Sequence, residues 1–72
     1  MPSTAVKQIL YEASSQTLYV TFVTSGRRYA YRDVPMETYD AFQHAFSKGT
    51  FFNQHIRDQY RHDLVFDPAA AS

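Results

Sequence analysis

The residues best suited to bind a ligand lie in one short segment, residues 47–53, with the sequence SKGTFFN. A glycine-containing turn that enters a helix presents unpaired N–H groups and the positive end of the helix dipole, and Lys48 adds a positive charge. Asn53 and Arg57 lie on or near the first turn of the helix that follows, where they can add hydrogen-bond donors. The segment therefore predicts an anion site.

The same segment has a simpler interpretation as a connector between two helices. Gly49 can end the first helix after Lys48, and Thr50 can cap the second. A Walker-type phosphate loop is excluded, because the glycine-rich stretch and the preceding strand of such a loop are missing. Both interpretations stay open at this point.

Arginines form a second set of candidate contacts. Arg28 and Arg32 project from the same face of a predicted strand, and Arg57 and Arg61 are four residues apart on a predicted helix. Together with Lys48 they can form a basic rim that contacts phosphates. The alternative is a solvated surface with local ion pairs, which contribute little. The predicted nucleic-acid or anion-binding residues are Lys48, Gly49, Asn53, Arg57, Arg28 and Arg32.

Tyr29 and Tyr31 form a Tyr-x-Tyr pair within the same predicted strand. Exposed rings on a sheet can stack unpaired nucleobases, so the pair could be a recognition platform. The alternative is core packing beside Phe22 and Val20, which the expected register of the sheet favours. A half-buried tyrosine often keeps its hydroxyl at the rim of a core, which makes a mixed role compatible with packing.

The three histidines, His44, His55 and His62, raise the question of a metal site. Zinc needs three or four converging ligands, and the spacing of the histidines indicates no such convergence. The sequence also lacks a cysteine nucleophile, a Gly-x-Ser-x-Gly motif and a paired-carboxylate signature. We therefore expect no catalytic activity, no metal and no cofactor.

The elements that must position these residues begin with three antiparallel strands, over residues 6–11, 17–23 and 27–32, in which apolar and polar side chains alternate. Turns centred on residues 14–15 and 25–26 predict that Tyr11 faces Leu18, Ile9 faces Val20, Phe22 faces Tyr29 and Val20 faces Tyr31. One face then holds Ile9, Tyr11, Leu18, Val20, Phe22, Tyr29 and Tyr31. The opposite face is mostly polar, with a small apolar patch of Leu10, Tyr19 and Ala30.

The second half predicts two short helices. Pro35 suits the first helical position, and apolar residues then recur on one helical face at Tyr39, Phe42 and Phe46. A second helix carries Phe52, Ile56 and Tyr60 at intervals of four residues. Residues 64–66 fit either a fourth edge strand or a tail packed on the core, and residues 67–72 predict a disordered tail.

The bulk composition is that of one small domain. The chain has 72 residues, of which seven are basic and seven acidic, so its formal net charge is zero. Strong non-specific nucleic-acid binders usually carry a positive excess, so the balance argues against such binding but leaves room for a local basic patch. No apolar run approaches the roughly 18 residues of a membrane span, and no signal peptide is visible. We expect a cytoplasmic protein that does not contact membranes.

The order and spacing of the residues resemble the KTSC domain family over roughly residues 3 to 65. The similarity rests on Leu18-x-Val20-x-Phe22, Gly26, Tyr29-x-Tyr31, Val34-Pro35, Tyr39, Ala45-x-Ser47-Lys48-Gly49, Phe51-Phe52-Asn53 and Ile56-Arg57. The family takes its name from the C-terminus of some lysyl-tRNA synthetases and also includes stand-alone bacterial proteins. The resemblance implies this fold and suggests RNA binding, whereas no activity is established for the family.

The expected fold is therefore α+β, with a three-stranded antiparallel β-meander followed by two short helices packed on one face, in one domain over residues 1–66. The leading hypothesis is a small non-catalytic binding module whose partner is RNA or another nucleic acid. The alternative is a protein-interaction or self-association module, with a protein partner or a weak homodimer. The neutral charge and the exposed strand edge of the sheet motivate this alternative.

Overall fold

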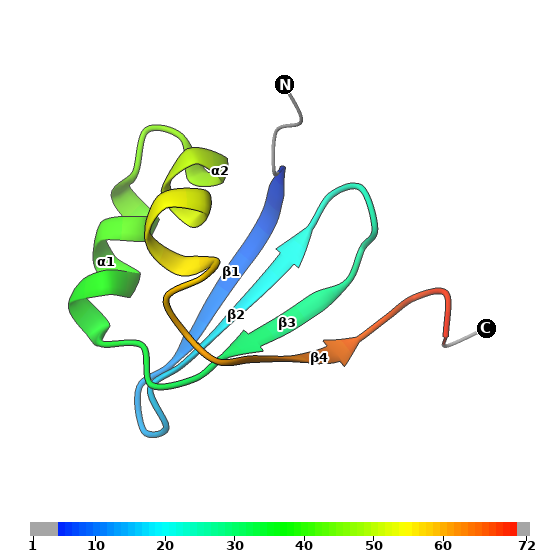
Figure 1. The fold of residues 1–72 in the computed structure, drawn as a ribbon, viewed down its shortest axis with the longest axis horizontal. Helices are drawn as coiled ribbons and strands as arrows, with labels where there is room; N and C mark the ends of the chain where they lie inside the picture. The colour runs from blue at the N-terminus through cyan, green and yellow to red at the C-terminus, as the bar shows by residue number, and fades with distance from the viewer. Residues whose placement is uncertain (1–4, 71–72) are drawn as a thin grey trace.

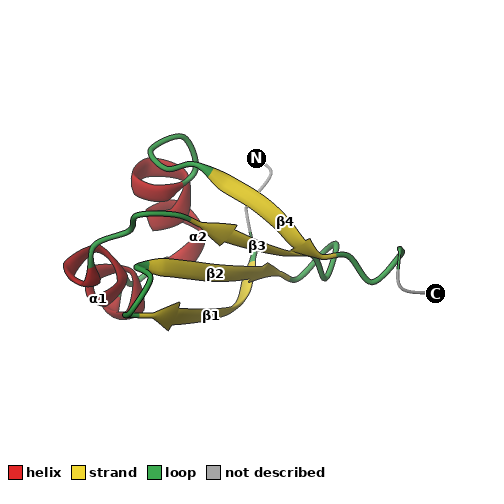
Figure 2. Cartoon of the chain, turned by 90° about the horizontal axis from the view of Figure 1, so that it is seen from below, coloured by secondary structure: helices red, strands yellow, loops and turns green. Residues whose placement is uncertain are grey.

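The protein folds as a four-stranded antiparallel sheet with helices on one face (Figure 1). The computed structural model describes residues 5–70. The strands lie side by side in chain order, and the helices come between the third and fourth strands (Figure 2). The elements are β1 (Val6–Glu12), β2 (Thr17–Phe22), β3 (Arg28–Tyr31), α1 (Met36–His44), α2 (Lys48–Phe51), the π-helix η1 (Phe52–Ile56) and β4 (His62–Phe66).

The first hairpin has the register that the sequence predicts. Tyr11 pairs with Leu18 and Ile9 pairs with Val20. Residues 13–16 form the connecting turn, in which the Gln16 N–H donates to the Ala13 carbonyl at 3.3 Å. Gln16 adopts a positive φ of 54° at the end of this turn. The polar residues between the two strands therefore predicted the pairing of this hairpin correctly.

The second hairpin differs from the prediction by two residues. Val20 pairs with Tyr29 and Leu18 with Tyr31, so the predicted pairs of Phe22 with Tyr29 and Val20 with Tyr31 were wrong. The connection is a four-residue loop, closed where the Phe22 N–H donates to the Arg27 carbonyl at 3.0 Å. Gly26, with φ of 69°, occupies the last loop position and not the centre of a two-residue turn. A shift of two residues leaves every side chain on its predicted face.

The fourth strand, β4, corrects the predicted three-stranded sheet. Tyr31 pairs with His62, Ala30 with Asp63 and Tyr29 with Leu64. Without β4, the backbone N–H and C=O groups of β3 on the side away from β2 would have no partners in the sheet. The chain returns from the helices along this side and pairs with them. The pairing shifts register between Arg28 and Tyr29, and all five residues of β4 are exposed.

The helices begin and end at other residues than the sequence predicts. Pro35 is the N-cap residue of α1 and lies outside the helix. At the other end the backbone becomes extended at Ala45, so Phe46 does not continue the helical face and is fully exposed. Gly49 does not end a helix but lies inside α2. The cap of α2 is Ser47, whose hydroxyl accepts from the backbone N–H of Thr50 at 3.2 Å. The predicted roles of Gly49 as a C-cap and Thr50 as an N-cap were therefore wrong.

The core lies between the sheet and the helices. The predicted apolar face of the sheet is confirmed, because its seven residues either are buried or pack against the buried cluster. On the opposite face Ala30 is fully buried, while Leu10 is 44% exposed. The buried cluster consists of Leu18, Val20, Tyr31, Val34, Phe42, Phe52 and Ile56.

The segment after β4 turns back toward the loop between β2 and β3. The Asp67 carboxylate lies 3.4 Å from the Arg27 guanidinium. A Cβ atom placed on Gly26 would come within 2.8 Å of Pro68 Cγ, which shows how closely the two segments approach. Residues 71 and 72 of the predicted tail lie outside the described residues, and the disorder of the tail stays a prediction.

Candidate functional site

The residues predicted at the junction of the two helices lie along α2, η1 and the residue that follows. The Lys48 ammonium donates to the Ala45 carbonyl at 2.9 Å, which ties it to the loop before α2. Gly49 is half-buried within α2, and Asn53 is exposed on η1. Arg57 is exposed one turn further along the chain, directly after η1.

The two arginines predicted on the third strand, Arg28 in β3 and Arg32 directly after it, alternate with Tyr29 and Tyr31 and so project from the other face of the sheet. The Arg28 guanidinium donates to the Thr21 hydroxyl at 3.1 Å, and that of Arg32 contacts the Asp63 carboxylate at 3.2 Å. Because the helices cover the opposite face (Figure 1), and because Arg28 and Arg32 contact Thr21 and Asp63, the structure does not bring these arginines together with Lys48 and Arg57. The six residues do not form one rim, and their part in binding stays a prediction.

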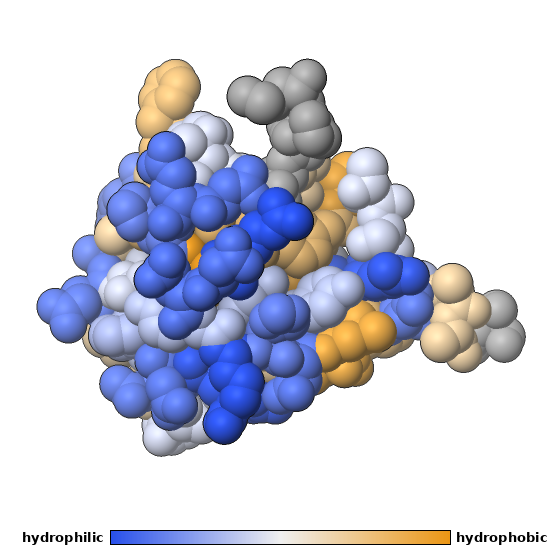
Figure 3. Space-filling model, in the orientation of Figure 1, coloured by the Kyte–Doolittle hydropathy of each residue, from blue (hydrophilic) through white to orange (hydrophobic). Residues whose placement is uncertain are grey.

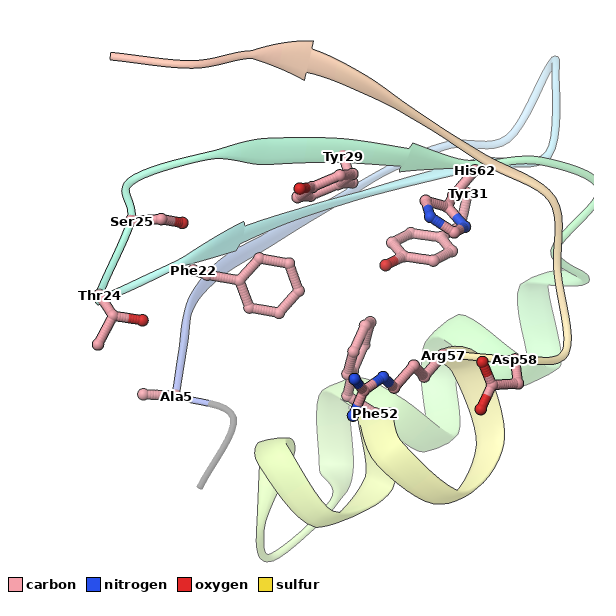
Figure 4. A pocket seen from close by; sticks show the side chains of 10 residues that line it. All are labelled: Ala5, Phe22, Thr24, Ser25, Tyr29, Tyr31, Phe52, Arg57, Asp58 and His62. Carbon is pink, nitrogen blue, oxygen red and sulfur yellow. The ribbon is translucent and has the colours of Figure 1, made fainter. Parts of the chain in front are cut away.

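The structure instead draws attention to a hollow between the sheet and η1 (Figure 4). It has a volume of about 440 Å³, which lies within the usual range for small-ligand sites. Its walls come from β2, β3, the β2–β3 loop, η1 and the start of β4. The lining residues are Ala5, Phe22, Thr24, Ser25, Tyr29, Tyr31, Phe52, Arg57, Asp58 and His62.

Five rings in mutual contact form the apolar part of this hollow. Phe52 makes edge contacts with Phe22 and Tyr31, with ring centroids 5.1 and 5.5 Å apart. His62 stacks on Tyr31 at 5.1 Å and contacts Tyr29 at 5.8 Å. Phe22 and Tyr29 close the chain of contacts at 5.9 Å. Edge and offset geometries of this kind are the arrangements that aromatic pairs prefer.

The helix beside the hollow contains a π-turn. The Arg57 N–H donates to the Phe52 carbonyl at 2.9 Å, a hydrogen bond that spans five residues and not four. Such turns occur in short pieces and are frequent at functional sites. Both residues joined by this bond line the hollow, so the extra residue of the turn helps to aim Phe52 and Arg57 at it.

The Tyr31 hydroxyl is the most perturbed group in the described part of the chain. The ring is 4% exposed, yet the hydroxyl makes no hydrogen bond within residues 5–70. Burial raises the pKa of Tyr31 to about 12, with further raising contributions from Tyr29 and Asp58 and a lowering one from Arg57. The phenol therefore stays protonated at neutral pH, as a hydrogen-bond donor and acceptor at the wall of the hollow.

A second hollow, beside Gln16, Met36 and Tyr39 at the start of α1, has one aromatic ring in its lining and no set of linked rings. Between residues 5 and 70, no three histidine, cysteine or acidic side chains are grouped closely enough to hold a metal ion. Nor does this part of the chain contain a helix long and apolar enough to cross a membrane. The hollow between the sheet and η1 is therefore the candidate site.

Comparison with known proteins defines the class to which this fold and hollow belong. The family model of the KTSC domain matches residues 2–60, so the chain belongs to the KTSC domain family. The crystal structure of a KTSC domain protein from Yersinia pestis superposes with a TM-score of 0.82, at 27% sequence identity, and covers 92% of each chain. The matched residues end just before β4, which adds His62 to the hollow.

The curated relatives are much longer proteins. Two lysine–tRNA ligases, from Trichormus variabilis and a Nostoc species, are 33% and 34% identical to this chain over 60 residues. The match covers 83% of this chain but only 10% of either ligase. The chain thus spans about a tenth of the length of these relatives, and it corresponds to a small module within them.

Sequence reasoning named Arg57 but not the hollow beside it. Tyr29 and Tyr31 were assigned to core packing, and Tyr31 is indeed buried, but both rings also line the hollow. The available signal was the number of aromatic residues on the sheet face near the β2–β3 loop. The helical layer buries Phe22 and Tyr29 only in part, so their rings are not fully enclosed.

Proposed function

We propose that this KTSC domain binds RNA by taking one unpaired nucleobase into the aromatic hollow. The single observation that supports the proposal is the set of five contacting rings around about 440 Å³ of open volume. Sequence-specific RNA recognition commonly uses splayed-out bases that stack on aromatic side chains and hydrogen-bond through their edges. The Tyr31 hydroxyl and the Arg57 guanidinium supply such polar groups at the wall.

The relatives add a reason to choose RNA among possible ligands. The matching segments belong to lysine–tRNA ligases, whose name states that they act on a transfer RNA. The net charge of zero argues that phosphate neutralisation contributes little to binding by this chain. Stacking is then the main source of affinity, and the affinity is expected to depend only weakly on salt.

A titration with short single-stranded RNA tests the proposal. Tyr29→Ala is expected to weaken binding about tenfold, because base stacking on one ring contributes about 1–3 kcal/mol. Tyr19→Ala is the matched control, since Tyr19 is a half-buried strand tyrosine on the opposite face. Fluorescence anisotropy measures both affinities. No binding at low salt, or an equal loss in the two variants, would contradict the proposal.

Self-association through β4 is a second candidate function. Among the described residues β4 pairs on one side only, and its last three residues, Leu64, Val65 and Phe66, are 45–49% exposed. A hydrophobic patch lies on the surface in the region of β4 (Figure 3). An open apolar edge can pair with another strand, and antiparallel pairing centred on Leu64 would place two copies of that residue opposite each other. A chain with zero net charge does not repel its own copy. The occupant proposed for this edge is therefore a second copy of the chain.

Sedimentation velocity at increasing concentration tests this second candidate. Leu64→Lys is expected to shift the protein toward monomer, because a lysine on an edge strand opposes pairing. Leu10→Lys is the control, since Leu10 is 44% exposed on β1 at the other edge of the sheet. A chain that stays monomeric at every concentration would rule the second candidate out.

A further inference from the structure

Two charged side chains at the wall of the hollow have no hydrogen-bond or ion-pair partner among residues 5–70. Arg57 and Asp58 are adjacent in the chain, and both line the hollow. Within residues 5–70 the Arg57 guanidinium and the Asp58 carboxylate make no hydrogen bond and no ion pair, either with each other or with another group. Both lie on the helical side of the hollow, across from Tyr29 and Tyr31 on the sheet (Figure 4). A donor and an acceptor thus border the hollow together with an aromatic surface (Figure 4).

This pair of groups can be compared with the edges of the four nucleobases. The Watson–Crick edge of guanine presents one acceptor, O6, followed by two adjacent donors, N1–H and the N2 amino group. A carboxylate can accept from both donors at once, and a guanidinium can donate to the acceptor. The arginine and aspartate together therefore match all three polar groups of guanine.

The other bases match the pair less well. Adenine offers a carboxylate one amino group and places an acceptor beside it, and cytosine offers one amino group beside two acceptors. Uracil has a single N3–H between two acceptors. In each of these complexes one carboxylate oxygen faces an acceptor or no group at all, which leaves a desolvated charge without a partner.

We propose that the hollow prefers guanine over the other bases, with Asp58 accepting from the N1–H and N2 amino groups and Arg57 donating to O6. This inference rests on the proposed RNA function, since it names the base that the same site takes. The aromatic rings provide the stacking surface common to all bases, and the charged pair provides the discrimination. Asp58 is thus assigned a role that the basic residues alone could not perform.

Binding of four oligouridines that differ only in one central base tests the preference. The oligonucleotide with a central guanine is expected to bind about tenfold more tightly than those with adenine, cytosine or uracil, as for one good bidentate base contact. Asp58→Asn is expected to reduce this ratio to about one, because the amide has one acceptor where the carboxylate has two. Tyr29→Ala is expected to weaken binding of all four alike.

Asp33→Asn is the matched control for the change in charge. Asp33 is exposed, does not line the hollow and has a φ of 58°, a backbone conformation that asparagine tolerates well. Both substitutions remove one negative charge, so any general gain in affinity for phosphates is shared. Only Asp58→Asn is expected to change the ratio between the bases.

The outcomes separate the guanine preference from the proposed function. Equal affinity for the four oligonucleotides, with Tyr29→Ala still weakening binding, overturns the preference and leaves RNA binding in place. No binding of any oligonucleotide overturns both. Guanosine monophosphate is the final probe: if it binds as tightly as the oligonucleotide, the guanine preference stands but the ligand is a free nucleotide and not RNA.

Discussion

The two ends of the helix-covered sheet face carry similar tyrosines in different environments. At the end covered by α1, the Tyr11 ring stacks on Tyr39 with centroids 4.8 Å apart and planes 9° apart, and its hydroxyl donates to the Val34 carbonyl at 2.6 Å. At the other end, Tyr31 contacts Phe52 and His62, but its hydroxyl makes no hydrogen bond within residues 5–70 and borders the hollow. We call the first the closed end and the second the open end, because only the second hydroxyl lacks a hydrogen-bond partner among residues 5–70.

The difference teaches that residue type and sheet face do not decide the role of a tyrosine. Tyr11 and Tyr31 share a face and a predicted packing role, yet only the first has every polar atom paired within the core. What differs is the helical segment that lies over each. A nine-residue helix covers the closed end, whereas a π-turn and the edge strand border the open one.

Removal of a large ring should affect the closed end most. Phe42 is fully buried and stacks on Phe51 at 5.2 Å, so Phe42→Ala is expected to lower the free energy of unfolding by about 3–5 kcal/mol. Phe22→Ala, at the open end, should cost about half as much, because its ring is only half-buried beside existing free volume. Urea denaturation measures both, and equal losses would remove the distinction between the ends.

High pH should destabilise the protein through the open end. The pKa of Tyr31 is raised to about 12 from 10.0, so the folded state holds this proton more tightly than the unfolded state. The resulting stability is fully present below pH 10 and is lost as the pH rises toward 12. Thermal denaturation across this interval should show a steeper decline for the wild type than for Tyr31→Phe. Superimposable curves would contradict the burial of this phenol.

Loss of the Tyr11 hydroxyl at the closed end should lower the free energy of unfolding. Tyr11→Phe removes the hydrogen bond to the Val34 carbonyl and leaves that carbonyl in a largely buried setting. We expect a loss of about 1 kcal/mol in the free energy of unfolding, as for a typical intramolecular hydrogen bond. Chemical denaturation measures it, and an unchanged midpoint would indicate that water replaces the lost donor.

The same chemical change at the open end should have the smallest effect. Tyr31→Phe removes a hydroxyl that makes no hydrogen bond in the described part of the chain, so its cost at neutral pH should stay within about 0.5 kcal/mol. The ring contacts with Phe52 and His62 are retained in the variant. A loss equal to that of Tyr11→Phe would show that the two hydroxyls are equally well satisfied.

The sequence predicted the faces of the sheet better than its edges. Alternation of side chains placed Val20, Phe22 and Tyr29 on the core side, and this held even where the register was wrong by two residues. The error came from Gly26, whose positive φ suits either a two-residue turn or the end of a longer loop. β4 was left undecided because a three-residue apolar segment fits a strand and a packed tail equally well.

The candidate site could be predicted only in part for a related reason. Arg57 was named from its charge, but the π-turn that aims it at the hollow depends on one backbone hydrogen bond with no sequence signature. The separation of Arg28 and Arg32 from Lys48 follows from the side of the sheet on which the helices pack. Hydrophobic patterning shows that a covered face exists, but not how much of that face is covered.

The one-sided pairing of β4 has a consequence for exchange with solvent. A strand whose residues are all exposed and which has one hydrogen-bonded neighbour opens locally at a lower free energy than the whole domain. Each opening carries His62 away from Tyr31 and removes one wall of the hollow. The backbone amides of β4 should therefore exchange with deuterium faster than those of β2. A ligand that contacts His62 should slow this exchange. The exchange rate of the β4 amides would then measure whether a ligand occupies the hollow.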